Sequence, residues 1–262
     1  MRYFDAHCHI QFDGYDEDRD ALISRMRDEE VGSLVVGVDM ASSKKAVALA
    51  QSHGHLYASI GLHPNTAGVQ EFDVQEFETL AEDGKVVAIG ECGLDYFRPE
   101  NPEAAKQKQR EVFQAHVDLA VKSGKPLMIH ARPSKGSQDA YEDALTMLES
   151  AKREHPELRG DFHFFVGDAA TAARAVALDF TLSYTAVLTF TSDYDEVIRS
   201  VPLSHLISET DSPYVAPAGR RGQRNDPLAA KDVVAAIARI RNEDEEVVRE
   251  AVLANAKQLF RI

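Results

Sequence analysis

The sequence has few cysteines, no long apolar run and no recognisable leader. Only Cys8 and Cys92 occur among its 262 residues, which argues against a disulfide scaffold and fits a reducing compartment. The longest apolar runs, such as Val86–Ile89, are far too short to span a bilayer. No charged leader followed by an apolar stretch opens the chain within Met1–Phe12. We therefore expect a cytoplasmic protein with no membrane partner.

Positive charge is also scarce. Asp and Glu number 43 against 29 Lys and Arg, so the formal net charge is −14. A protein that holds long duplex DNA through its phosphates normally has basic patches, and only Lys106–Arg110 and Arg220–Arg224 stand out here. A phosphate-bearing substrate would therefore need bound metal ions to supply much of the local positive charge. The other interpretation is that the acidity simply keeps the protein soluble.

Short strand-like segments alternate with helix-like segments along the chain. The predicted strands are Tyr3–His9, Ser33–Val38, Leu56–Gly61, Val86–Glu91, Pro126–His130, Asp161–Phe165, Phe180–Tyr184 and Leu206–Asp211. The predicted helices are Arg19–Glu30, Lys44–Ser52, Pro102–Ser123, Ala140–His155, Ala169–Leu178, Ser192–Val201, Pro227–Asn242 and Asp244–Phe260. Several of the strands are almost wholly apolar, as buried parallel strands are.

This alternation predicts an α/β fold with a parallel sheet. Eight strands close a (β/α)8 TIM-type barrel, which typically takes about 250 residues. We therefore predict a single barrel domain over residues 1–262. An open doubly wound sheet is the alternative, but no Gly-x-Gly-x-x-Gly turn follows the first strand, which weakens a dinucleotide-binding interpretation.

Polar side chains gather at the carboxyl ends of the predicted strands, where such barrels place their active sites. His7 and His9 are two apart on one strand and so point the same way. Imidazole and carboxylate groups together suit zinc, manganese or iron-type ions. The predicted metal ligands, each within two positions of a strand end, are His7, His9, Glu91, His130, His163 and Asp211. One ion needs only three or four protein ligands, so the set predicts two divalent ions bridged by Glu91.

Other polar residues and the two cysteines lie near these ligands in the sequence. His63 follows the third strand, and Glu209 lies two residues before Asp211, so it either supports a ligand histidine or forms a polar layer in the barrel. Asp5 should point inward, one layer below His7. Cys8 and Cys92 should face the helices, and because strands one and four are not adjacent we expect no disulfide. No role is assigned to the remaining histidines, which are His53, His55, His116, His155 and His205.

Several motifs together resemble the TatD family of metal-dependent deoxyribonucleases, within the wider amidohydrolase-like barrels. They are Phe4–His9, Gly61–Pro64, Gly90–Tyr96, Ile129–Arg132, His163–Gly167, Glu209–Pro213, Arg221–Pro227 and Asn255–Phe260. The resemblance implies a monomeric or weakly associated barrel with two divalent ions that cleaves phosphodiester bonds in DNA. It also implies that His7, His9, Glu91 and Asp211 bind one ion, and that Glu91, His130 and His163 bind the other.

Two segments depart from the family pattern, both on the substrate side of the barrel. Pro133–Gln138 intervenes after Arg132, where the family usually has an acidic or amide residue and a short loop. Phe164–Val166 replaces the family's usual Cys-Phe-Ser after His163. These departures concern the substrate and the polarity of cleavage and leave the metal ligands intact.

The expected reaction is hydrolysis by metal-activated water, in which two ions stabilise both oxygens of an in-line displacement. Asp211 would orient the water and accept its proton, next to the bridging Glu91. Arg132 lies on the same side as His130 and is either a phosphate contact or a surface ion pair. His63 is assigned to the substrate or to support of a ligand. The expected partner is DNA, as single strands or ends, and the metal is left open among zinc, manganese and magnesium.

Two alternative functions follow from the same residues. The first is hydrolysis of a small ester, amide or phosphotriester, as in other amidohydrolase-like barrels. Many of those use a carboxylated lysine at the end of strand four, where this chain has Glu91. The second is a non-catalytic protein with structural metals, but structural zinc sites are usually closed sets of four ligands, often thiolates.

Overall fold

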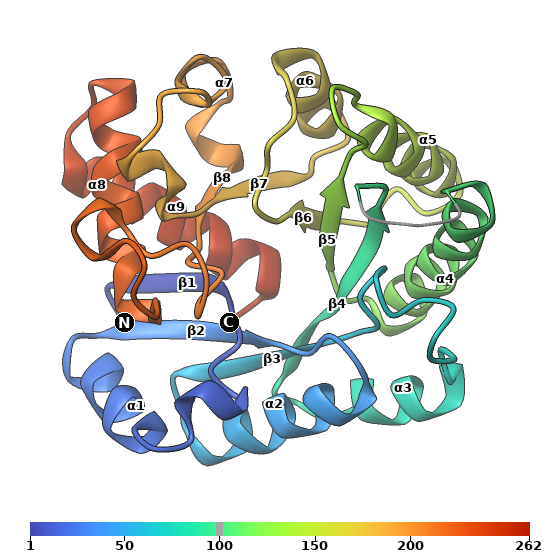
Figure 1. Cartoon of the computed structure of the whole chain (residues 1–262), viewed down its shortest axis with the longest axis horizontal. Helices are drawn as coiled ribbons and strands as arrows, with labels where there is room; N and C mark the ends of the chain where they lie inside the picture. The colour runs from blue at the N-terminus through green and yellow to red at the C-terminus, as the bar shows by residue number, and fades with distance from the viewer. Residues whose placement is uncertain (98–101) are drawn as a thin grey trace.

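The computed structural model describes residues 1–97 and 102–262, and its strands form one parallel sheet in sequential order (Figure 1). Neighbouring strands pair in the order in which they occur in the chain. The strands are β1 (Tyr3–Cys8), β2 (Val31–Val36), β3 (Leu56–Ile60), β4 (Val86–Asp95), β5 (Leu127–Arg132), β6 (Gly160–Phe162), β7 (Thr181–Tyr184) and β8 (Leu206–Ser208).

The sheet closes where the segment after β8 meets β1. The Asp211 N–H donates to the carbonyl of His7 at 2.9 Å, and the His9 N–H donates to the carbonyl of Ser212 at 2.8 Å. The buried Asp5 carboxylate strengthens this seam, because it accepts from the backbone N–H of Thr210 at 2.8 Å and from its hydroxyl at 2.7 Å. The predicted (β/α)8 barrel is confirmed, and the inward orientation of Asp5 follows the strand alternation.

Helices pack around the barrel; the first seven connect successive strands, and the last two follow β8 (Figure 1). They are α1 (Arg19–Asp28), α2 (Met40–Ser52), α3 (Val74–Ala81), α4 (Pro102–Ser123), α5 (Asp139–Glu154), α6 (Ala169–Ala177), α7 (Asp195–Ser200), α8 (Ala230–Arg241) and α9 (Glu245–Phe260). No helix in the described ranges is long and apolar enough to cross a membrane.

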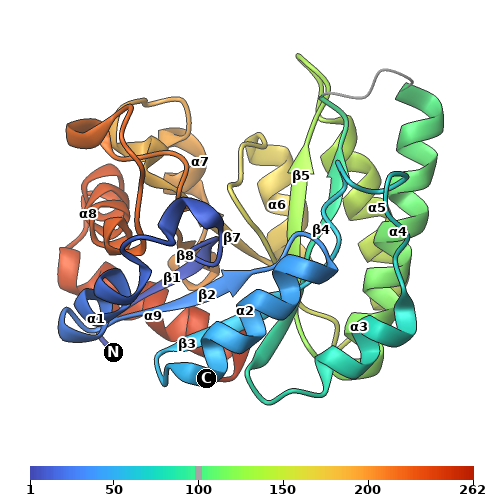
Figure 2. The same ribbon diagram turned by 60° about the horizontal axis from the view of Figure 1, so that its bottom comes forward.

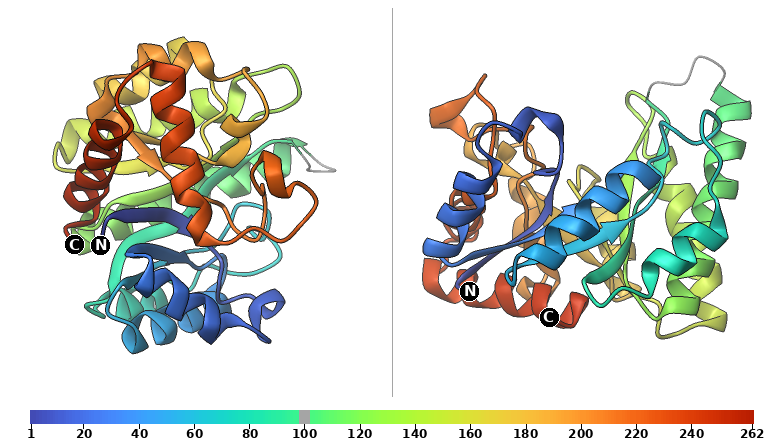
Figure 3. Two further views of the ribbon diagram at one scale, coloured as in Figure 1. Left: turned by 90° about the vertical axis from the view of Figure 1, so that its left-hand side faces the viewer. Right: turned by 90° about the horizontal axis from the view of Figure 1, so that it is seen from below.

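Helix α9 covers the end of the barrel at which the strands begin (Figures 2 and 3). Its Leu253, Ala256, Leu259 and Phe260 pack in one buried cluster with barrel-interior residues that include Phe4, Leu34, Ala88, Met128 and Ile207. Burial of this apolar surface removes it from water and seals that end of the barrel. The polar residues at the carboxyl ends of the strands therefore have access to solvent only from the opposite end.

Several elements differ from the sequence prediction. Helix α3 was not predicted, although Asp73 caps it by accepting from the Glu76 N–H at 3.1 Å and Phe77 and Ala81 are buried beneath it. An Asp followed three residues later by Glu, just before apolar residues spaced four apart such as Phe77 and Ala81, is a recognisable helix start. Strand β6 ends at Phe162 and β8 at Ser208, both three residues before the predicted ends. The two cysteines are free and buried, as predicted.

Strand β4 is longer than predicted and carries an irregularity at the site. Between Ile89 and Cys92 the strand advances three residues while β5 advances only two, from Leu127 to Ile129. Such a bulge bends a strand and re-aims a side chain. Gly90, with φ of 142°, permits the close approach, because a Cβ there would lie 2.3 Å from the Met128 carbonyl oxygen. The result is that Glu91 points into the mouth of the barrel.

Candidate metal centre

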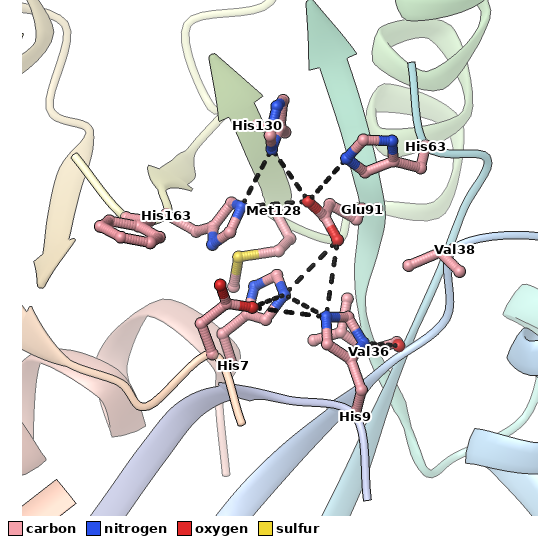
Figure 4. Close-up of polar contacts among 12 residues, drawn as sticks. His7, His9, Val36, Val38, His63, Glu91, Met128, His130 and His163 are labelled. Atoms are coloured by element: carbon pink, nitrogen blue, oxygen red, sulfur yellow. Dashed lines mark hydrogen bonds and ion pairs between the residues drawn. The ribbon is translucent and has the colours of Figure 1, made fainter. Parts of the chain in front are cut away.

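Glu91 lies at the centre of the polar cluster, with its two carboxylate oxygens facing different groups of histidines (Figure 4). Its Oε1 lies 3.1 Å from His130 Nδ1 and 3.0 Å from His163 Nε2. These two ring nitrogens are 3.3 Å apart. One oxygen and two imidazoles thus converge on a single small volume between β4, β5 and the end of β6.

The second group faces the other oxygen of Glu91 (Figure 4). Glu91 Oε2 lies 3.5 Å from His7 Nε2 and 3.8 Å from His9 Nε2. The two histidine nitrogens are 3.2 Å apart, and Asp211 Oδ1 is 3.6 Å from His9 Nε2. The six predicted ligands therefore form two adjacent groups that share Glu91, which is the arrangement expected for a bridging carboxylate.

The orientation of two of these histidines is fixed by hydrogen bonds on the side away from the cluster, and a third has a carboxylate nearby on that side. His9 Nδ1 lies 2.9 Å from the Val36 carbonyl, an acceptor that requires the proton to be on Nδ1. His130 Nε2 lies 3.2 Å from Asp95 Oδ2, and His163 Nδ1 lies 3.5 Å from Glu209 Oε2. A proton held by an outer acceptor leaves the inner nitrogen with a lone pair for a metal.

Glu209 supports the ligands from below, which agrees with one of its two predicted uses. Its Oε2 approaches His163 Nδ1 and lies 3.9 Å from His7 Nδ1, while its Oε1 accepts a short hydrogen bond from the Phe164 N–H. Burial raises the pKa of Glu209 to about 7, although the neighbouring His163 opposes that rise. The residue is fully buried and reaches two histidines from different groups.

The charges within the cluster are strongly coupled. Burial disfavours the carboxylate form of Glu91, but His63, His163 and His130 outweigh it and hold the pKa of Glu91 well below its ordinary value. Burial and the adjacent His163 lower the pKa of His7 to about 3. For His163, burial is outweighed by Glu91 and Glu209, which raise its pKa well above the usual value. A proton on His163 thus occupies the position that a cation would take.

The cluster has the chemistry of a divalent-cation site. Within residues 1–97 and 102–262, no Lys or Arg nitrogen lies within 4 Å of a carboxylate oxygen of Glu91, Asp95, Glu209 or Asp211. Buried carboxylates are costly unless they are paired or coordinate a metal. His7 Nε2 and His9 Nε2 also face each other at 3.2 Å, which suits a cation bound by both rings. The residues therefore fit divalent metal ions held by imidazole and carboxylate groups.

A cavity of about 710 Å³ opens above this cluster. Its wall includes His63, Arg132 and four aromatic rings, those of Phe12, Phe164, Tyr194 and Tyr214. The Arg132 guanidinium lies over the Phe97 ring at 4.1 Å from its centre, so this side chain is held at the rim by cation–π contact. The predicted substrate residues thus line the same space as five of the six predicted ligands, whereas His7 is fully buried.

Three of the seven non-glycine residues that have positive φ in the described ranges lie around this cavity. Phe164, Asp211 and Val215 have φ of 45°, 51° and 50°, in the left-handed region that such residues rarely adopt. All three line the cavity. Strained residues persist where surrounding contacts fix them, and they gather at functional sites. Asp211 lies three residues beyond the end of β8, so the seam with β1, rather than the strand itself, places its carboxylate.

Two residues of the site were missed from the sequence. Asp95 holds His130 and also accepts from the Asn65 side chain at 3.0 Å. Glu91, Gly93 and Asp95 alternate along β4, so the period of two could have placed Asp95 on the same face. His116, which was assigned no role, accepts the Leu62 N–H at 3.0 Å beneath His63. No local signal marks that contact, because it joins residues 54 apart.

The barrel and its histidine–carboxylate cluster define a class, the metal-dependent hydrolases. The chain belongs to the family described as TatD related DNase, whose model matches residues 4–261. It is 35% identical to the uncharacterized metal-dependent hydrolase YabD of Bacillus subtilis, over 99% of each chain, and 30% identical to YcfH of Escherichia coli, over 100% of this chain and 97% of that one. The crystal structure of YJJV, a TatD homologue from Escherichia coli, superposes with a TM-score of 0.89 at 27% identity, covering 100% of this chain and 98% of the other.

Proposed function

We propose that this hydrolase is a deoxyribonuclease that cleaves phosphodiester bonds in single-stranded DNA or at DNA ends, with two divalent ions. The observation that carries the proposal is the division of Glu91 between two groups of ligands, with Oε1 toward His130 and His163 and Oε2 toward His7 and His9. Paired ions are suited to phosphoryl transfer because charge develops on both the attacking and the leaving oxygen.

The metal ligands and the Asp211 carboxylate would have different roles in the reaction. Divalent ions held by the six ligands would lower the pKa of water and neutralise charge on the phosphate. Burial raises the pKa of Asp211, but His9, His7 and His163 outweigh it and hold that pKa below the ordinary value. Asp211 is therefore ionised at neutral pH, so its carboxylate can orient a water and accept its proton.

The cavity wall favours an anionic substrate with flat rings. Arg132 stands at the rim as a guanidinium, which matches the geometry of phosphate oxygens. Phe12, Phe164, Tyr194 and Tyr214 line the same space, and Tyr214 is 55% exposed. Aromatic side chains stack on the bases of single strands without sequence preference. A strand would enter with its phosphate toward the ligands and its bases against these rings.

The net charge of −14 also bears on the substrate. An acidic surface repels long duplex DNA, whose binding depends on many phosphate contacts. Ions and Arg132 supply positive charge only locally, at the mouth of the barrel. This distribution supports short or single-stranded DNA over extended duplex. The family's description as DNases agrees with the proposal, whereas the relatives YabD and YcfH are described only as metal-dependent hydrolases.

The test is cleavage of a labelled single-stranded oligonucleotide by the purified protein, with magnesium, manganese or zinc added to chelator-treated samples. We expect metal-dependent cleavage and a loss of at least about 100-fold in Glu91→Gln, because that residue serves both groups. Glu17→Gln is the matched control, since Glu17 is exposed and does not line the cavity. An unchanged rate in Glu91→Gln would refute the site.

Substrate identity is tested by the same preparation. If the protein binds metal but cleaves no DNA, the proposed nuclease activity fails, and hydrolysis of small esters, amides or phosphotriesters becomes the function to assay. If it binds no metal, the ligand assignment fails as well. The two failures are distinguishable because metal content is measured without any substrate.

A further inference from the structure

His63 differs from the histidines around it in the contact made by its outer nitrogen. Its Nδ1 accepts a hydrogen bond from the backbone N–H of Asn65 at 3.1 Å. His9, by contrast, places its outer nitrogen against the carbonyl of Val36, and His130 places its outer nitrogen against the carboxylate of Asp95. A backbone N–H is only a donor, so the ring nitrogen that it meets must carry a lone pair.

This contact decides the tautomer of the neutral imidazole. With Nδ1 as acceptor, the proton of His63 is on Nε2, the nitrogen that faces the cavity. Nε2 lies 3.2 Å from Glu91 Oε1 (Figure 4). A nitrogen that carries a proton donates to this oxygen and cannot at the same time bind a cation. His63 therefore lies at ligand distance from the centre but presents a donor.

Neighbouring contacts hold His63 in this orientation. The Leu62 N–H donates to buried His116, and the His63 N–H donates to the Val38 carbonyl at 2.9 Å. The Thr66 hydroxyl donates to the His63 carbonyl at 2.7 Å. His63 and the turn that follows it, which supplies the Asn65 N–H, are thus held by one hydrogen bond within the turn and by others to Val38 and, through Leu62, to α4. Rotation of the ring by 180° would exchange Nδ1 with Cδ2 and so put a C–H against the Asn65 N–H.

We propose that His63 is not a metal ligand but a fixed hydrogen-bond donor, whose Nε2–H binds a non-bridging phosphate oxygen of the substrate beside Glu91. The substrate part of this inference rests on the proposed nuclease function. The ring is already oriented in the protein, so substrate binding needs only a shift of the Nε2–H from Glu91 Oε1 to the adjacent phosphate oxygen, and an oriented donor of this kind is effective as negative charge grows there. His63 lines the cavity and is accessible from it.

The tautomer is tested directly by two-bond ¹H–¹⁵N NMR of the ring nitrogens, with and without zinc. We expect His63 to show a protonated Nε2 and a bare Nδ1 in both samples, whereas the His130 Nδ1 resonance shifts on zinc binding. Loss of the His63 Nε2 proton signal, with a zinc-induced shift of that nitrogen, would show that it is a ligand and overturn the proposal. This measurement uses the wild-type protein and no substrate.

Variants separate donation from ligation. His63→Phe should keep the zinc content of the wild type but lose about 100-fold in kcat on single-stranded DNA, the usual effect of removing one donor to a developing charge. His63→Gln places an amide N–H near the position of Nε2 and should recover about 10-fold of that loss. A fall in zinc content in His63→Phe, with folding intact by circular dichroism, would contradict the proposal.

The outcomes also distinguish this inference from the proposed function. If wild-type protein cleaves no DNA, the nuclease assignment fails while NMR and zinc content still decide whether His63 donates or ligates. If DNA is cleaved and His63→Phe retains full kcat, the donor role toward substrate is wrong even where the tautomer is correct.

Discussion

The buried His116 should make the free energy of unfolding of this protein fall steeply as the pH is lowered below about 6.5. The residue is fully buried in α4, where its Nδ1 donates to the Val112 carbonyl at 2.8 Å and its Nε2 accepts the Leu62 N–H. The ring of Phe72 packs on it, with ring centres 4.0 Å apart. Both nitrogens are satisfied only in the neutral form. Protonation would break the contact with Leu62 and place a charge among apolar groups.

The magnitude follows from the difference between the two pKa values. Burial lowers the pKa of His116 to about 4 in the folded protein, against 6.5 for the ordinary side chain. Between these values the unfolded chain binds the extra proton, so the free energy of unfolding rises with pH. The stabilisation is fully present above about pH 6.5 and is lost as the pH falls toward 4. From pH 7 to pH 4.5 the expected loss is about 2.5 kcal/mol, at 1.36 kcal/mol per unit.

The assay compares wild-type protein with His116→Gln, whose amide can still accept from Leu62 but cannot titrate. Urea unfolding followed by circular dichroism, with chelator present, gives the free energy of unfolding at pH 7 and pH 4.5. The wild type should lose about 2.5 kcal/mol more than the variant over this range. Equal losses would refute the reasoning. An NMR titration of His116 in the wild type gives an independent result, since a midpoint near 6.5 would also contradict it.

Two further predictions concern the metal centre. Asp95→Asn should weaken zinc binding about 10- to 100-fold, because the amide holds the His130 ring without the carboxylate charge. The control variant Asp20→Asn, at an exposed position, should leave zinc affinity unchanged. Competition with a chromophoric chelator measures both affinities. Zinc affinity should also rise between pH 6.5 and pH 8, because His163, whose pKa is raised by Glu91 and Glu209, must give up a proton. Calorimetry in two buffers of different ionisation enthalpy should detect that proton, and a pH-independent affinity with no proton release would contradict the assignment.

The position of most of the site could be predicted from local sequence. His7 and His9 are two residues apart at the end of β1, and His130 lies near the end of β5, so strand alternation and strand direction alone placed them at one end of a barrel. Glu91 was found in the same way, although the bulge in β4 that aims it depends on pairing with β5. Periodicity is a property of the sequence of each segment, so it can be recognised without knowing how the segments pack together.

The function of several side chains was decided only by contacts between distant segments. Asp95 acts on His130 across 35 residues, and Glu209 reaches back to His163. Asp211 is placed by the seam between β8 and β1 and not by a strand. Whether a histidine ligates or donates depends on the atom that meets its outer nitrogen. The sequence alone determined which residues gather at the barrel mouth, because that follows from strand period and direction. The tertiary structure decided which ring nitrogens carry protons and how the side chains are oriented, because both depend on hydrogen-bond partners that only the closed barrel brings together.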